Sequence, residues 1–146
     1  MSEAKRYILP ESIYPVVLTR PSLDEPHWVA ARNEELHIQR CKHCRRFQWG
    51  PEFLCHHCHS FDLGFERVSP SGTIYSWERV WHPVSPEVQP YVPYVILVVE
   101  LDDAPGIYAT GNLVGDPTVE IPIGAQVAAA FEHHDDYTLV QWRLAQ

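Results

Sequence analysis

The chain has 146 residues and a mass of 16.8 kDa, the size of one ordinary domain or two small ones. Apolar residues make up 45% and charged residues 21%, which excludes an intrinsically disordered protein. The longest strictly apolar run, Tyr94–Val99, is far shorter than the roughly 20 residues of a membrane-spanning helix. Residues Met1–Arg6 are not followed by the apolar core of a signal peptide. We therefore expect a globular, cytoplasmic protein with no membrane segment.

The formal net charge of −8 is unevenly distributed. The first 67 residues carry nine basic and nine acidic side chains, whereas the rest carry only Arg79 and Arg143 against ten acidic residues. Nucleic-acid affinity comes largely from Lys and Arg that neutralise phosphates, so this acidic half argues against binding along a nucleic-acid backbone. A nucleic-acid function would depend on the first half alone.

Thirteen prolines and seven glycines interrupt the sequence, which favours short strands and turns over long helices. We divide the chain into a leader (1–35), a cysteine-bearing module (36–62) and a strand-rich remainder (63–146). The leader contains Pro10, Pro15 and Pro21 and is predicted to be extended before its one helix.

That helix is predicted at about 24–35. Asp24 is a better N-cap than Ser22, because it places Pro26 in the first turn, where the missing N–H costs nothing. The segment carries a narrow apolar stripe made of Trp28, Val29 and Leu36. We expect this stripe to pack on the protein's own body, with docking on a partner as the alternative.

The remainder is predicted to be β-structure. Alternation over Thr73–His82 places Tyr75, Trp77 and Trp81 on one face, and Tyr94–Leu101 is apolar almost throughout, as expected of a strand covered on both faces. Further strands are predicted at Gly106–Leu113, Val127–His133 and Tyr137–Leu144. Short strands with no helical period between them favour a small closed barrel over a sandwich.

All four cysteines lie within 18 residues, as Cys41-x-x-Cys44 and Cys55-x-x-Cys58. Two such pairs can bring four thiolates together around one Zn²⁺, each pair forming a tight knuckle. Residues 36–40 and 48–50 are the predicted strands on either side of the first knuckle, and the ten-residue spacer requires a compact loop.

Other uses of these cysteines are less favoured. Disulfides do not suit a reducing cytosol, and a redox C-x-x-C expects a neighbouring βαβ unit. Iron is an alternative metal, because a cage of four thiolates suits it too. The nearby histidines are expected to face solvent: His43, His56, His57 and His59. A four-thiolate shell leaves no position for substrate, so the metal is predicted to be structural.

Basic residues surround the first knuckle: Arg40, Lys42, Arg45 and Arg46, with no acidic residue between 36 and 51. The simpler interpretation is a solvated turn that balances the anionic metal centre. The functional one is a phosphate site for a nucleotide-bearing cofactor. Trp49 and Phe53 either cover the ribbon or stack on a base.

No G-x-S-x-G motif, Walker A motif or G-x-G-x-x-G loop is present, and the predicted metal would use every cysteine as a ligand. His82 has no identifiable partner in the sequence, and the turn His133–Asp136 is more simply a solvated loop than an acid–base site. We therefore predict no catalytic residue.

Several segments together resemble a known family. They are Glu25–Trp28, the two cysteine pairs, Ser71–Ser76, Pro93–Leu101, Gly111–Gly115 and Ile123–Val127. In this order, over about residues 22–133, the chain resembles the acyl-CoA-associated family that joins a rubredoxin-like zinc ribbon to an OB-fold, long catalogued as a domain of unknown function.

The resemblance implies a mainly β fold, with an N-terminal helix and zinc ribbon (36–62) followed by a small OB-fold β-barrel (63–146). It implies four metal ligands: Cys41, Cys44, Cys55 and Cys58. Family members usually have glycine directly after each knuckle, where this chain has Arg45 and His59. A non-glycine residue can take the required positive φ at modest cost.

The resemblance also implies an accessory subunit in a hetero-oligomer with a thiolase-like enzyme, an aldolase or a hydratase, in which the partner supplies the catalytic residues. Lys42, Arg45 and Arg46 are then the candidate contacts for the phosphates of acyl-CoA. A single-stranded nucleic-acid module using Tyr75, Trp77 and Trp81 is the alternative function. An independent enzyme using His82 or His133–Asp136 ranks last.

Overall fold

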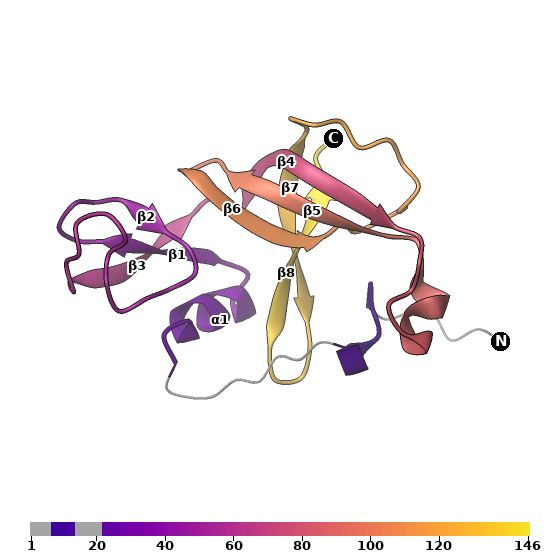
Figure 1. Ribbon diagram of the computed structural model, residues 1–146, viewed down its shortest axis with the longest axis horizontal. Helices are drawn as coiled ribbons and strands as arrows, with labels where there is room; N and C mark the ends of the chain where they lie inside the picture. The colour runs from indigo at the N-terminus through magenta and orange to yellow at the C-terminus, as the bar shows by residue number, and fades with distance from the viewer. Residues whose placement is uncertain (1–6, 14–21) are drawn as a thin grey trace.

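The computed structural model describes residues 7–13 and 22–146 (Figure 1). Pro15 and Pro21 of the expected extended leader lie outside these residues. The elements in chain order are η1 (Glu11–Ile13), α1 (Glu25–Arg32), β1 (Leu36–Cys41), β2 (Phe47–Gln48), β3 (Leu63–Val68), β4 (Ser71–Val80), η2 (Pro86–Tyr91), β5 (Tyr94–Leu101), β6 (Ala104–Asn112), β7 (Gln126–His133) and β8 (Thr138–Leu144). None of the helices in the described ranges has the length and apolarity needed to cross a bilayer.

The strands form two antiparallel sheets, one of three strands in the order β2-β1-β3 and one of five in the order β6-β5-β4-β7-β8. In Figure 1 the small sheet lies beside α1 at one end of the molecule, and the large sheet curls across the other. Strand β3 was not predicted, because glycine and charged residues interrupt its apolar alternation. It pairs with the whole of β1, from Leu36 opposite Val68 to Cys41 opposite Leu63.

The predicted strand at 94–101 is β5, with the same bounds, and the three later predicted strands agree with β6, β7 and β8 to within two residues. The strand expected at 48–50 is shorter and earlier, at Phe47–Gln48. Long apolar or alternating runs therefore located the barrel strands well, whereas the two-residue β2 depends on its pairing with β1.

A β-bulge in β4 changes which aromatic side chains are exposed. The register with β5 shifts between Ile74 and Ser76, which makes Tyr75 an extra residue in the strand. Tyr75 is therefore 59% exposed, whereas Trp77 packs against the core. Trp81 follows the end of the strand. The prediction that Tyr75, Trp77 and Trp81 share one face is wrong, because simple alternation does not anticipate an inserted residue.

The two edge strands of the large sheet, β6 and β8, come together where β6 ends. Leu113 forms a parallel bridge with Trp142, and the N–H of Val114 donates to the carbonyl of Trp142 at 2.8 Å. Gly111 lies beside this contact, and a Cβ there would be 2.6 Å from the Val140 carbonyl oxygen. β6 and β8 can approach this closely because residue 111 has no side chain. The result is a curled OB-fold half-barrel.

One hydrophobic core connects the two sheets. It includes Leu36 and Ile38 from the ribbon together with Ile74, Leu97 and Trp142 from the half-barrel. A second, smaller cluster joins Leu9, Val88 and Tyr94. Because one core is shared, the ribbon is fixed against the half-barrel.

Helix α1 begins after Asp24, as predicted, with Pro26 in its first turn. The Asp24 side chain does not cap the backbone; its Oδ2 accepts a hydrogen bond from the Trp28 indole at 2.9 Å. The helix ends at Arg32 and not at Glu35. Glu34 has a φ of 59°, and the N–H groups of residues 34 and 35 bond back to Ala31 and Ala30, forming a Schellman end without its usual glycine.

The expected apolar stripe is only partly buried. Trp28 is half-buried, but Val29 is 48% exposed, and Leu36 lies in the core as the first residue of β1. The helix buries Ala30 and Ala31 instead. Ending the helix at Arg32 removes Leu36 from the helical pattern, so the three residues do not form one face.

Candidate metal centre

Two similar turns carry the cysteine pairs. The N–H of Arg45 donates to the carbonyl of Cys41 at 3.0 Å, and the N–H of His59 donates to the carbonyl of Cys55 at 3.1 Å. Arg45 has a φ of 67° and His59 a φ of 62°. These are the two positions where the family usually has glycine. Both knuckles therefore keep their turn geometry with a non-glycine residue in the left-handed region.

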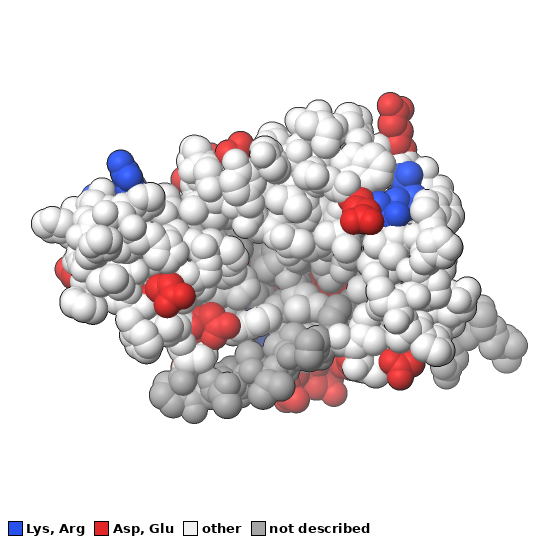
Figure 2. All heavy atoms as spheres, viewed as in Figure 1, with Lys and Arg blue, Asp and Glu red and all other residues white. Residues whose placement is uncertain are grey.

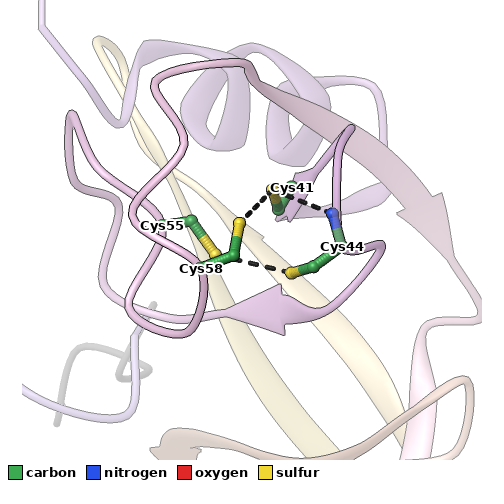
Figure 3. A group of neighbouring side chains, drawn as sticks. All are labelled: Cys41, Cys44, Cys55 and Cys58. Carbon is green, nitrogen blue, oxygen red and sulfur yellow. Dashed lines mark hydrogen bonds between the residues drawn. The ribbon is translucent and has the colours of Figure 1, made fainter.

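The four sulfur atoms converge, as predicted (Figure 3). All lie within 4.8 Å of one another, and the Cys41–Cys58 and Cys44–Cys55 Sγ distances are each 3.6 Å. Thiolates bound tetrahedrally to zinc are about 3.8 Å apart, whereas a disulfide bond is about 2.05 Å long. All four cysteines are free. Their spacing is that of a metal site.

Backbone N–H groups point at two of the sulfurs. Those of Cys44 and His43 lie 3.4 and 3.3 Å from Cys41 Sγ, and they lower the pKa of this thiol. The N–H of Cys58, followed by that of His57, lowers the pKa of Cys55 to about 6. These donors favour the thiolate form that binds metal.

The cluster as a whole needs a cation. Although the Ser60 N–H favours the thiolate of Cys58, desolvation and the neighbouring thiols raise the pKa of Cys58 to about 11. Four thiolates at this spacing repel one another, and a divalent ion removes that repulsion. The donor set and its geometry therefore fit a tetrahedral dication held by Cys41, Cys44, Cys55 and Cys58.

Two buried glutamines hold the loop between the knuckles, and sequence analysis did not single them out. Gln48 Nε2 donates to Gln39 Oε1 at 2.6 Å, and Gln48 Oε1 accepts from the N–H of His56 at 2.8 Å. Gln39 exchanges hydrogen bonds with both the N–H and the carbonyl of Glu52, at 3.0 and 2.9 Å. These bonds explain how a ten-residue spacer places the second knuckle against the first.

The histidines near the cysteines lie at the surface. His43, His56, His57 and His59 are exposed, and the metal-binding group found among the described residues contains cysteines alone. His57 Nδ1 lies 2.9 Å from Arg46 Nη1.

The structure brings acidic residues to the basic turn, although none is near it in sequence. Arg45 Nη2 lies 3.6 Å from Oε2 of Glu66 in β3, and Lys42 Nζ lies 4.0 Å from Asp62 Oδ1. In the described part of the chain no carboxylate forms an ion pair with Arg46. Arg46 is therefore the candidate phosphate contact with the least competition from acids.

The turn His133–Asp136 is not simply a solvated loop. The His134 side chain is fully buried, with its Nε2 2.8 Å from Glu132 and its Nδ1 3.1 Å from Glu11. His133 and the two aspartates are exposed, as expected for a hairpin tip. Only His134 departs from the expected solvated loop, because residues 7–13, which are distant in the sequence, cover it.

The His134 ring also lies between two tyrosines, with centroids 3.9 Å from Tyr7 and 4.5 Å from Tyr137. The N–H of Ile8 donates to Glu132 at 3.3 Å. These contacts fasten residues 7–13 to the β7–β8 hairpin. The other histidine considered as an acid–base group, His82, is exposed beyond the end of β4.

Comparison with known proteins also divides the chain into a zinc ribbon and an OB-fold. Residues 28–64 match the family described as "ChsH2, rubredoxin-like zinc ribbon domain", and residues 65–132 match "ChsH2, C-terminal OB-fold domain". A solved structure described as an Ltp2-ChsH2(DUF35) aldolase superposes on this chain with a TM-score of 0.77 and 30% identity, covering 90% of this chain and 99% of that one. The chain belongs to the ChsH2 type of the DUF35 family.

Relatives of this ChsH2-type chain include longer proteins. The probable enoyl-CoA hydratase alpha subunit of Thermomonospora curvata is 36% identical over 111 residues, which are 74% of this chain and 34% of that protein. A DUF35 domain-containing scaffold protein of Methanocaldococcus jannaschii is 31% identical over 94 residues, 63% of this chain and 64% of that protein. The chain thus spans about a third and somewhat under two thirds of these relatives.

A further solved structure of the DUF35 family, from Sulfolobus solfataricus, has a TM-score of 0.62 at 12% identity and covers 87% of both chains. At that identity it shows that the ChsH2-type fold is shared, and nothing more.

Proposed function

We propose that this chain is a non-catalytic accessory subunit of a cytoplasmic hetero-oligomer that processes acyl-CoA thioesters, with a thiolase-like protein, an aldolase or a hydratase as its partner. The observation that carries the proposal is its similarity to the ChsH2(DUF35) chain of an aldolase, which it covers almost completely. The hydratase subunit and the scaffold protein among its relatives support the same class of function.

We further propose that the four cysteines hold a structural Zn²⁺. Four thiolates complete a tetrahedral shell, so no ligand position is left for a substrate or a reactive water. The metal would join the two knuckles and supply folding free energy, on the order of 10 kcal/mol for structural zinc. Elemental analysis of the purified chain should give one zinc per chain. A stoichiometric iron content with the colour of an iron–thiolate centre would identify iron instead.

The accessory role is tested by purifying the chain with its partner from the native source and identifying that partner by mass spectrometry. Turnover of acyl-CoA is then measured for the chain, the partner and the complex. We expect no turnover by the chain alone and turnover by the complex. Product formation by the isolated chain, or a partner unrelated to aldolases, hydratases and thiolases, would contradict the proposal.

The basic turn is the proposed contact for the phosphates of acyl-CoA. Replacing Lys42, Arg45 and Arg46 with Ala should raise the KM for acyl-CoA several-fold in the assembled complex and leave kcat unchanged, because charge-assisted bonds to the phosphates would be lost. Arg67→Ala is the control, since Arg67 is also an exposed cation of the ribbon sheet but lies 3.2 Å from Glu35. Equal KM values for the triple variant and the parent would contradict this assignment.

A further inference from the structure

A cleft between the ribbon and the half-barrel has no part in the function proposed above. It has a volume of about 420 Å³, within the range of small-molecule sites. Its walls come from α1 and β1 on one side and from β6 and β8 on the other. Figure 2 shows the surface hollowed between these two parts of the molecule.

The described residues that line the cleft carry no formal charge. Among the described residues that line it, none is Asp, Glu, Lys or Arg, although such residues make up 21% of the chain. Its one histidine, His27, is kept neutral, because burial lowers its pKa to about 4. Bringing an ion into such surroundings removes its hydration without supplying a counter-charge.

The inner wall is mainly apolar; the side chains of Asn112 and Gln141 are already hydrogen-bonded, and His27 Nδ1 is buried without a hydrogen-bond partner. Ile38, Ile96 and Val140 contribute hydrocarbon surface. The Asn112 side chain donates to the Val95 carbonyl at 3.1 Å, and Gln141 Oε1 accepts from the N–H of Asn112 at 2.6 Å. A ligand would therefore meet mainly hydrocarbon inside the cleft.

Aromatic and hydroxyl-bearing side chains stand at more exposed positions. The His27 ring packs edge-on against Trp28 and Trp49, with centroids 5.1 and 5.0 Å away, and Trp49 is 36% exposed. On the opposite side Tyr108 is 40% exposed and Thr110 is also exposed. The rim thus offers hydroxyl groups to a polar end of a ligand.

We propose that this cleft binds a neutral, largely hydrocarbon molecule with a single hydroxyl group, such as a long-chain alcohol. The hydrocarbon part would fill the uncharged interior, and the hydroxyl would stay at the rim near Tyr108 and Thr110. A carboxylate or an ammonium of the same chain length binds much more weakly. This assignment requires neither a partner subunit nor CoA.

The test uses the full, metal-loaded chain and the neutral fluorescent probe N-phenyl-1-naphthylamine, whose emission rises in apolar surroundings. The bound probe is displaced with 1-decanol, decanoate and decylammonium. We expect saturable probe binding, and displacement by decanol at a concentration at least ten-fold lower than by either ion. Absence of probe binding, or displacement by an ion at the same concentration as decanol, would overturn the proposal.

A pair of variants locates the site. Thr110→Trp adds bulk at an exposed position that lines the cleft and should weaken probe binding at least ten-fold. Ser76→Trp makes the same change at an exposed position of β4 outside the cleft and should leave binding unchanged. Equal affinities for the two variants would overturn the assignment. If Thr110→Trp does not fold, the displacement series on the unaltered chain still decides.

Discussion

Arg45 and His59 each occupy the left-handed backbone region at the end of a knuckle. For an L-residue with a side chain this conformation costs about 1–2 kcal/mol. The sequence identifies both positions, because each directly follows a Cys-x-x-Cys pair, but only the backbone angles show that the turn geometry is kept. The knuckles therefore store strain that the chain tolerates because the metal-binding turns require this shape.

His59→Gly should raise the free energy of unfolding by about 1 kcal/mol, because glycine relieves this strain. Urea unfolding of the metal-loaded protein measures the change. His56→Gly is the matched control in the same knuckle, at an exposed residue without a positive φ, and it should give no gain. A destabilised His59→Gly protein would contradict the prediction.

His27 should make stability depend on pH. Burial lowers its pKa from 6.5 to about 4, against the opposing attraction of Asp24. Between these values the unfolded chain binds more protons than the folded one, so this contribution is complete above about pH 6.5 and is lost as the pH falls towards 4. The loss approaches about 3 kcal/mol.

The measurement compares unfolding free energies of the parent and His27→Phe across this pH range. Acid release of the metal affects both proteins, so the difference between them isolates His27. As the pH falls, we expect the unfolding free energy of His27→Phe to rise relative to that of the parent. A constant difference would show that His27 is protonated equally in both states.

At the scale of elements, patterning predicts those strands whose own residues carry the signal. β5 is apolar at every position except Glu100 and was predicted to the residue. β3 and the end of α1 were missed for different reasons. β3 has only weak alternation and is held by its partner β1. α1 ends at Arg32, and the residue with positive φ that follows is Glu34, which is not a typical helix terminator. Partner strands and non-glycine turns give little local signal.

Gln39 and Gln48, which hold the loop between the knuckles, likewise give no local signal in the sequence. Gln48→Leu should leave the N–H of His56 and the carbonyl of Leu54 without their side-chain partner. Leaving buried groups unpaired costs about 1–3 kcal/mol each, and poorer positioning of the ligands should lower metal affinity about 10- to 100-fold.

Competition with a chelator measures that affinity. Gln89→Leu is the control, because Gln89 is exposed in η2 and lies outside the ribbon. Gln48→Leu and Gln89→Leu proteins with the same metal affinity would show that the amide network does not support the second knuckle.

At the scale of the whole molecule, the metal site was predictable and the cleft was not. The four ligands lie within one short stretch of sequence, so their spacing alone shows that they can converge. The cleft combines residues as far apart as Leu9 and Gln141, and it exists because the shared core fixes the ribbon against the half-barrel. No local pattern in the amino-acid sequence predicts that arrangement.

His134 links the two ends of the described chain, so its replacement has a long-range effect. His134→Phe keeps a ring between Tyr7 and Tyr137 but removes the 2.8 Å hydrogen bond between His134 Nε2 and Glu132, whose side chain is 12% exposed. Losing the hydrogen bond to a buried polar group costs about 1–3 kcal/mol. We expect a corresponding loss of unfolding free energy and faster proteolysis within residues 7–13.

His133→Phe is the matched control, because the neighbouring His133 side chain is 43% exposed, and its stability should change by less than about 1 kcal/mol. Equal stabilities of the two variants would show that the buried contacts of His134 do not fasten the segment.

The contact between Val114 and Trp142 has a consequence for biosynthesis. The ribosome delivers the residues of the ribbon, through Val68, well before those of β8. All four cysteine ligands are therefore synthesised before any residue of β8. Until residue 142 emerges, β6 has no β8 to close against, and the growing polypeptide exposes this part of β6 to other newly made chains.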